Sequence, residues 1–319
     1  MWLDKLEYRD SLDLPEDLTF GIEIEFANAR RKYIEEELDN AYEKGIINSK
    51  WNLKYEETIF GNQETSYIKG GEATSDILHD NKKDWNNIKY ACDTINFYGG
   101  TTNKYCGAHV HINGNFLKDN MKYYDRLIKL YTIYEDVIMR FWYGEDNKPR
   151  PNLNIFAGSP IIIFNTIRDY FYYNHKHNLT FDEFLSFMTG SRNKNLALSF
   201  SRLSKNFLES YYNITNNWKQ YRTLEFRGAM GTTKPVIWQN YINLPAKLVL
   251  CCMDDKKDWK KINRLYEKTI HGINNNKYNC NKAIDFADFI FNNDLDKKNF
   301  MLQYIKDEED VKVRKKTKY

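Results

Sequence analysis

The chain has 319 residues, enough for one large domain or two ordinary ones with a sizeable core. Its 47 basic side chains against 44 acidic ones leave a formal net charge of +3, which excludes a global basic field for nucleic acid or membranes. The five cysteines form no CxxC pair, the start is acidic, and no apolar run approaches the roughly 20 residues that span a bilayer. These features predict a cytoplasmic protein with reduced thiols and no membrane contact.

The first half of the chain predicts strands that alternate with helices after a polar leader, residues 1–17. Strands are expected from alternation of apolar and polar residues, and helices from apolar residues at spacings of three and four. In chain order the expected elements are a strand at 18–27, a helix at 33–44, strands at 51–59 and 66–78 around a turn at Gly61 and Asn62, a helix at 83–98 and a strand in "CGAHVHI", 106–112.

The second half predicts more helix than strand. The expected elements are a helix at 121–142, a loop at 143–154, a short helix that begins with a capping box of Thr180 and Glu183, a strand within 221–232 and a helix at 238–253 that contains Pro245. Residues 254–319 are expected to form a polar, helical extension with a basic tail. Because strands and helices mix without a βαβ rhythm, the fold class is α+β with a largely antiparallel sheet.

Three of the predicted strands carry paired chemical groups. Each of the segments 23–25 (EIE), 109–111 (HVH) and 225–227 (EFR) sets two polar side chains around one apolar residue. Residues i and i+2 of a strand lie about 6.6 Å apart on one face, and the residue between them points to the other face. If the three strands share a sheet, the polar side chains of all three converge.

This set of groups favours a metal site. Three carboxylates packed closely repel one another, and a bound cation relieves that repulsion. A site rich in oxygen, with one or two imidazoles and no thiolate, suits Mg²⁺ or Mn²⁺ better than zinc. Cys106 lies on the same strand as the histidines but on its opposite face, so we interpret it as a core residue.

Other interpretations stay open at this point. Any one of these strands alone fits an ordinary half-exposed strand with a charged outer face. A metal-dependent hydrolase could use the same histidines and carboxylates around a bound water, although it usually needs more imidazoles. A non-catalytic nucleic-acid-binding module could use the aromatic residues and the basic tail, but the near-neutral charge argues against it.

Five short motifs occur in an order that resembles the amidoligase family. They are "FGIEIEF", "WNLKYEETI", "GGEATSDIL", "CGAHVHI" and "TLEFRGAMGT", and the resemblance spans Phe20 to Met253. Members of this family are ATP-dependent carboxylate–amine ligases related to glutamine synthetase and glutamate-cysteine ligase. The resemblance implies a catalytic domain over 18–253, with a curved antiparallel sheet of that type, flanking helices and the active site on its concave face.

The resemblance also implies roles for individual residues. The implied metal ligands are Glu23, Glu25, Glu56, His109 and Glu225. The implied catalytic residues are Glu72, His111 and Arg227, and the residues implied to contact ATP are His111, Arg227, Arg192 and Asn195. Within the pair His109 and His111, the first is expected at the metal and the second near the nucleotide phosphates.

Two departures from the family pattern affect these expectations. The Asp-x-Ser of the family is Glu56-Glu57-Thr58 here, so either acid could face the site, and Asp76 stands where proline is usual. No P-loop motif is present, so arginines and metals would have to hold the phosphates. The expected reaction forms an amide from a carboxylate and an amine acceptor, which could be an amino acid, a peptide or a protein, through an acyl phosphate.

Overall fold

A computed structural model describes residues 2–56, 59, 70–143, 148–151, 153–173, 180–189, 193–270 and 279–306. Within these residues six strands form one sheet in the order β2-β3-β1-β4-β6-β5. The strands are β1 (Phe20–Phe26), β2 (Trp51–Tyr55), β3 (Gly71–Ser75), β4 (Gly107–Asn113), β5 (Leu198–Ser199) and β6 (Thr223–Met230). Every neighbouring pair is antiparallel, which confirms the predicted α+β class and sheet type.

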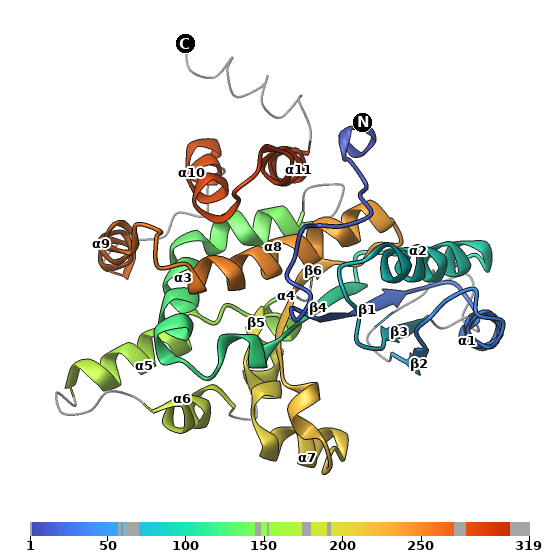
Figure 1. The fold of residues 1–319 in the computed structure, drawn as a ribbon, viewed down its shortest axis with the longest axis horizontal. Coiled ribbons are helices and arrows are strands. Elements are labelled where there is room, and N and C mark those ends of the chain that lie inside the picture. The colour runs from blue at the N-terminus through green and yellow to red at the C-terminus, as the bar shows by residue number, and fades with distance from the viewer. Residues whose placement is uncertain are drawn as a thin grey trace.

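The helices flank this sheet (Figure 1). They are α1 (Arg31–Glu43), α2 (Lys82–Phe97), α3 (Met121–Trp142), α4 (Leu153–Phe156), α5 (Ile161–Tyr173), α6 (Phe181–Met188), α7 (Lys205–Tyr212), α8 (Pro235–Met253), α9 (Trp259–Ile270), α10 (Cys280–Ile290) and α11 (Asp294–Ile305). In the part of the chain that the structure describes, no helix has the length and apolar character needed to cross a bilayer.

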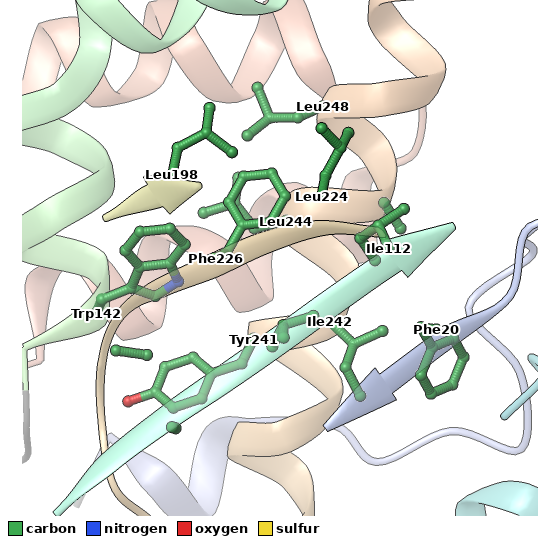
Figure 2. Close-up of a cluster of buried hydrophobic side chains, with 14 of the residues drawn as sticks. Phe20, Ile112, Trp142, Leu198, Leu224, Phe226, Tyr241, Ile242, Leu244 and Leu248 are labelled. Atoms are coloured by element: carbon green, nitrogen blue, oxygen red, sulfur yellow. The ribbon is translucent and has the colours of Figure 1, made fainter. Parts of the chain in front are cut away.

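One face of the sheet carries the hydrophobic core. The apolar residues of β1, β4 and β6 point to this face, where α8 contacts β4 and α3 contacts β6. Figure 2 shows Phe20, Ile112 and Phe226 of these strands beside Ile242 and Leu244 of α8. The other face therefore receives the residues in between, which include all the polar pairs predicted from the sequence.

A β-bulge interrupts the pairing of β4 with β6. Ala108 pairs with Ala229 and Val110 with Phe226, so two residues of β6, Arg227 and Gly228, lie opposite a single residue of β4. A Cβ atom on Gly228 would lie 2.6 Å from the Cε3 atom of Trp142 on α3. Glycine at this position therefore lets the indole of α3 pack directly on the bent strand.

The predicted elements compare closely with these bounds. The helix expected at 121–142 has those limits in α3, and the capping box of Thr180 and Glu183 begins α6 as predicted. The helix at the end of the predicted catalytic segment begins three residues earlier than expected, because Pro235 occupies its first turn. The expected turn at Gly61 and Asn62 lies outside the described residues.

Both ends of the described chain pack against the core. Asp296 on α11 is fully buried and accepts hydrogen bonds from Arg9, near the start of the chain, at 2.6 Å and from Asn243 on α8 at 2.9 Å. Helices α10 and α11 contact both α3 and α8. Cys106 is buried, as predicted, and burial raises the pKa of its thiol to about 12.

Candidate functional site

The polar face of the sheet gathers side chains from four neighbouring strands. Residues paired across adjacent strands point to the same face, so the register decides which groups meet. Glu25 pairs with Glu72, Glu23 with His109, and His111 with Glu225. The side chains on this face are Glu23 and Glu25 of β1, Glu72 and Thr74 of β3, His109 and His111 of β4, and Glu225 and Arg227 of β6.

This face is buried, although an alternating strand usually exposes its polar side to water. The four carboxylic acids and two imidazoles are each only between 3% and 9% exposed. Charged groups are buried in this way only when they are paired or bind a ligand. The burial therefore marks this face as the candidate site.

His109 lies between two groups of acids. Its Nδ1 is 2.6 Å from Oε2 of Glu23 and 4.0 Å from Oε1 of Glu225, while its Nε2 is 3.5 Å from Oε1 of Glu25. A neutral imidazole has one nitrogen that accepts and one that donates. The ring can therefore bind a metal on one side and donate a hydrogen bond to a carboxylate on the other.

His111 faces a different set of partners. Its Nε2 is 3.0 Å from Oε1 of Glu23, and its Nδ1 is 3.2 Å from the hydroxyl of Thr223 and 3.5 Å from Nη1 of Arg202. Arg202 comes from a short 3₁₀-helix, Ser201–Leu203, and its guanidinium also stacks 4.4 Å from the ring of Tyr212. A cavity beside these residues is lined by Gly21, Ser75, His111 and Arg202, among others.

Two further guanidiniums lie at the other end of the site. Arg227 forms an ion pair with Glu225 and donates from Nε to the carbonyl oxygen of Phe156 at 3.3 Å. Arg150 donates to the backbone carbonyl of Arg227 at 3.0 Å. A Cβ atom on Gly107 would lie 2.1 Å from Nη1 of Arg150 and 3.2 Å from Oε1 of Glu25, so glycine here gives the guanidinium room beside the acid.

The acids differ in how strongly they hold a proton. Burial alone would raise the pKa of Glu23, but the charge of His111 and the hydrogen bond with His109 outweigh it and hold that pKa well below its usual range. Burial also opposes ionisation of Glu225, and Arg227 lowers its pKa despite this. For Glu72, burial and the neighbouring charge of Glu23 raise the pKa to about 7.

The donor set fits divalent metal ions. Two groups of residues each bring one ligand atom per residue within 4.8 Å of one another, and they are Glu23, His109 and Glu225, and Glu25, Glu72 and His109. Carboxylate oxygens with a single imidazole match the preference of Mg²⁺ and Mn²⁺. Burial is the main cause of the raised pKa of Glu72, and the charge of Glu23 adds to it; a bound cation would offset the repulsion between these two acids.

Four residues expected at the site, Glu56, Glu57, Arg192 and Asn195, stay predictions. Glu56 follows β2 and belongs to neither group of candidate ligands among the described residues. Asn195 ends a 3₁₀-helix, and its backbone carbonyl accepts a hydrogen bond from Gly158 at 2.9 Å. Glu57 and Arg192 lie outside the described residues, so their expected positions stay predictions.

Two arginines of the site were not predicted. Arg150 lies in a proline-containing loop and Arg202 in a single 3₁₀ turn, where no periodic pattern distinguishes a buried guanidinium from a solvated one. The only available signal was the position of Arg202, two residues after the end of the apolar "LALSF" segment, 196–200.

The fold and the site define an α+β protein whose sheet carries a buried face of carboxylic acids, imidazoles and guanidiniums. A family model described as "Putative amidoligase enzyme" matches residues 16–249. The chain therefore belongs to this amidoligase family, as its five motifs predict. The match supports an enzyme of the ligase type over a hydrolase or a nucleic-acid-binding module. No curated protein and no solved structure matches the chain.

Proposed function

We propose that the chain is an ATP-dependent carboxylate–amine ligase that uses Mg²⁺ or Mn²⁺. The observation that carries this proposal is the gathering, among the described residues, of four carboxylic acids and two imidazoles with three guanidiniums at one buried face. Acids and imidazoles alone suit many metal enzymes, whereas guanidiniums beside them suit a polyphosphate. Under this proposal the sheet is of the glutamine synthetase and glutamate-cysteine ligase type.

In the first step, an oxygen of the substrate carboxylate attacks the γ-phosphorus of ATP and the bond to ADP breaks, which gives an acyl phosphate. Bound Mg²⁺ or Mn²⁺ supplies positive charge to the phosphates. Arg202 and Arg227 neutralise charge that develops on the transferred group, and His111 hydrogen-bonds a phosphate oxygen. The three side chains suit this role because His111 and Arg202 are in contact and Arg227 is held by Glu225.

In the second step, the amine nitrogen attacks the acyl carbon and inorganic phosphate leaves, so the products are an amide, ADP and phosphate. The amine must lose a proton as its bond forms. We assign this proton to Glu72, since a carboxylate of the same buried face can act as the general base.

The first test needs no knowledge of the substrates. We expect calorimetry to detect ATP binding in the presence of Mg²⁺ and to lose it when EDTA removes the metal. Equal ATP affinity with and without EDTA would contradict the proposal, and so would the absence of any ATP binding.

A second test reports the acyl phosphate. Hydroxylamine replaces the amine acceptor and converts an acyl phosphate into a hydroxamate, which iron(III) colours. We expect a panel of small carboxylic acids and amino acids, each with ATP, Mg²⁺ and hydroxylamine, to yield hydroxamate together with ADP. Glu43→Gln, which changes an exposed acid of α1, is the matched control for site variants and should behave as the parent. ATP hydrolysis without hydroxamate for any member of the panel would favour a hydrolase.

A further inference from the structure

A second cavity lies next to the candidate site. It measures about 430 Å³, within the roughly 300–1,000 Å³ range of small-molecule pockets. Its lining combines acids with arginines, and among these residues are Glu135, Asp136 and Arg140 of α3, Arg150, Asn154 and Tyr304. Of these side chains only Arg150 belongs to the three guanidiniums of the proposed site, and neither step of the proposed reaction gives it a role of its own.

Two polar atoms at this cavity have no hydrogen-bond partner among the described residues. One is Oε1 of Glu135, an acceptor, and the other is Nε of Arg150, a donor on a side chain that is only 7% exposed. The neighbouring acid Asp136 is already neutralised by Lys282 at 2.7 Å. A buried acceptor and a buried donor left unmatched at one cavity indicate a ligand that supplies a donor to the first and an acceptor to the second.

The charges of Glu135 and Arg150 restrict the chemical class of ligand that the cavity can bind. Burial raises the pKa of Glu135 to about 6, so this carboxyl is ionised at neutral pH at a cost that a bound cation would offset. The guanidinium of Arg150 is cationic and accommodates a carboxylate. An ammonium beside Glu135 and a carboxylate beside Arg150 together make the head group of an α-amino acid.

Arg150 also connects this cavity to the metal-binding face. Its Nη2 holds the backbone carbonyl of Arg227 at 3.0 Å, and its Nη1 lies against Gly107 at the position next to Glu25. The guanidinium of Arg150 therefore lies between the cavity and the carboxylates of the candidate site.

The far wall of the cavity comes from a part of the chain beyond the family match, which ends at residue 249. Tyr304 on α11 contributes its ring and accepts a hydrogen bond at its carbonyl oxygen from Nε of Arg140 at 3.1 Å. Lys306 donates to the carbonyl oxygens of Arg140 and Tyr143 and closes the same corner. Helix α11 thus adds Tyr304 to a lining that otherwise comes from the matched residues.

From these observations we infer that the cavity binds the head group of a free α-amino acid, as one of the two substrates of the ligase. This inference rests on the proposed function, because it names the class of one substrate. The recognition chemistry is a salt bridge from the ammonium to Glu135 and one from the carboxylate to Arg150.

The test uses the full chain at pH 8 and the twenty L-amino acids as probes, each titrated by calorimetry with and without Mg²⁺ and a non-hydrolysable ATP analogue. We expect at least one amino acid to bind, and its deaminated analogue to bind at least about 10-fold more weakly. Glu135→Gln should weaken binding of the amino acid about 10-fold or more and leave the analogue unaffected, whereas Glu43→Gln on α1 should change neither.

Two results would overturn the inference. One is that no amino acid binds the parent under either condition, and the other is that Glu135→Gln keeps both the affinity and the preference for the ammonium group. Thermal melting of Glu135→Gln checks that the variant folds. Metal-dependent ATP binding by the parent protein separates the two proposals: a parent that binds ATP but no amino acid rejects the cavity assignment alone, and a parent that binds an amino acid but no ATP rejects the ligase.

Discussion

The two faces of the central sheet are both buried, but for opposite reasons. On β1, Ile22 and Ile24 are 0% exposed and pack under the helices, while Glu23 and Glu25 between and after them are 7% and 5% exposed. Burying the isoleucines stabilises the fold, whereas burying the acids costs free energy that the protein alone recovers only in part. One strand can therefore contribute apolar side chains to the core from one face and acidic side chains to the candidate site from the other.

The largest expected effect is a loss of stability when a residue of the apolar face is truncated. Ile24→Ala removes a fully buried side chain, so we expect it to lower the free energy of unfolding by about 2–5 kcal/mol. Its folded fraction should bind metal with unchanged affinity, because the side chain points away from the ligands. Urea denaturation and metal titration of the folded protein measure the two quantities. A large loss of metal affinity in the folded variant would mean that the two faces do not act separately.

A substitution on the polar face should instead lower metal affinity and change stability little. Glu23→Gln removes one candidate ligand, so Mg²⁺ or Mn²⁺ affinity should fall at least roughly 10–100-fold, the loss seen even for residues behind metal ligands. Stability should change less than in Ile24→Ala, since the amide relieves repulsion among the acids. Calorimetric metal titration checks this, with Glu43→Gln as the control. If the curves of the variant and the parent coincide, Glu23 is not a ligand.

A finer distinction lies within the polar face. His109 belongs to both groups of candidate ligands, and His111, which contacts Arg202, belongs to neither among the described residues. We therefore expect His109→Ala to lose metal affinity first and His111→Ala to weaken ATP binding about 10-fold with metal affinity little changed. Titrating metal without nucleotide, and then ATP at saturating metal, separates these effects. Identical defects in both variants would indicate a two-histidine metal site of the hydrolase kind.

The smallest effect concerns the acid of the second cavity. Burial raises the pKa of Glu135 from 4.5 to about 6, so the folded state is favoured below pH 4.5 and loses this contribution as the pH rises through 6. Without ligand, Glu135→Gln should therefore be more stable than the parent at pH 8, by at most about 2 kcal/mol, and equal to it at pH 4. Denaturation at both pH values tests this. Equal stability at pH 8 would show that the carboxyl already has a cationic partner.

The sequence allowed the main strands of the site to be predicted because their chemistry follows the period of a strand. Alternation in 23–25, 109–111 and 225–227 placed the acids and histidines on one face, and the register of the sheet brings them together. The same alternation also fits an ordinary half-exposed strand. The burial of that face depends on the helices and loops packed around it, which alternation does not report.

Other parts of the site could not be predicted from the sequence, for physical reasons. Strand β5 has only two residues, too few for a period of two to be recognised. Arg150 and Arg202 come from irregular segments that tertiary packing alone brings to the sheet. The bulge in β6 could not be predicted from the sequence either, because a glycine after Arg227 is compatible with the regular end of a strand as well as with a bulge.

That bulge has a consequence for how the chain finds its native pairing. A slip of β6 along β4 by one residue would turn Glu225 into the core, which is costly. A slip by two residues would keep the faces but bring Phe226 or Met230 to the place of Gly228, where even a single Cβ would lie 2.6 Å from Trp142. Sterically, only one register lets α3 close over the sheet. A molecule that completes this core therefore also sets His111 opposite Glu225.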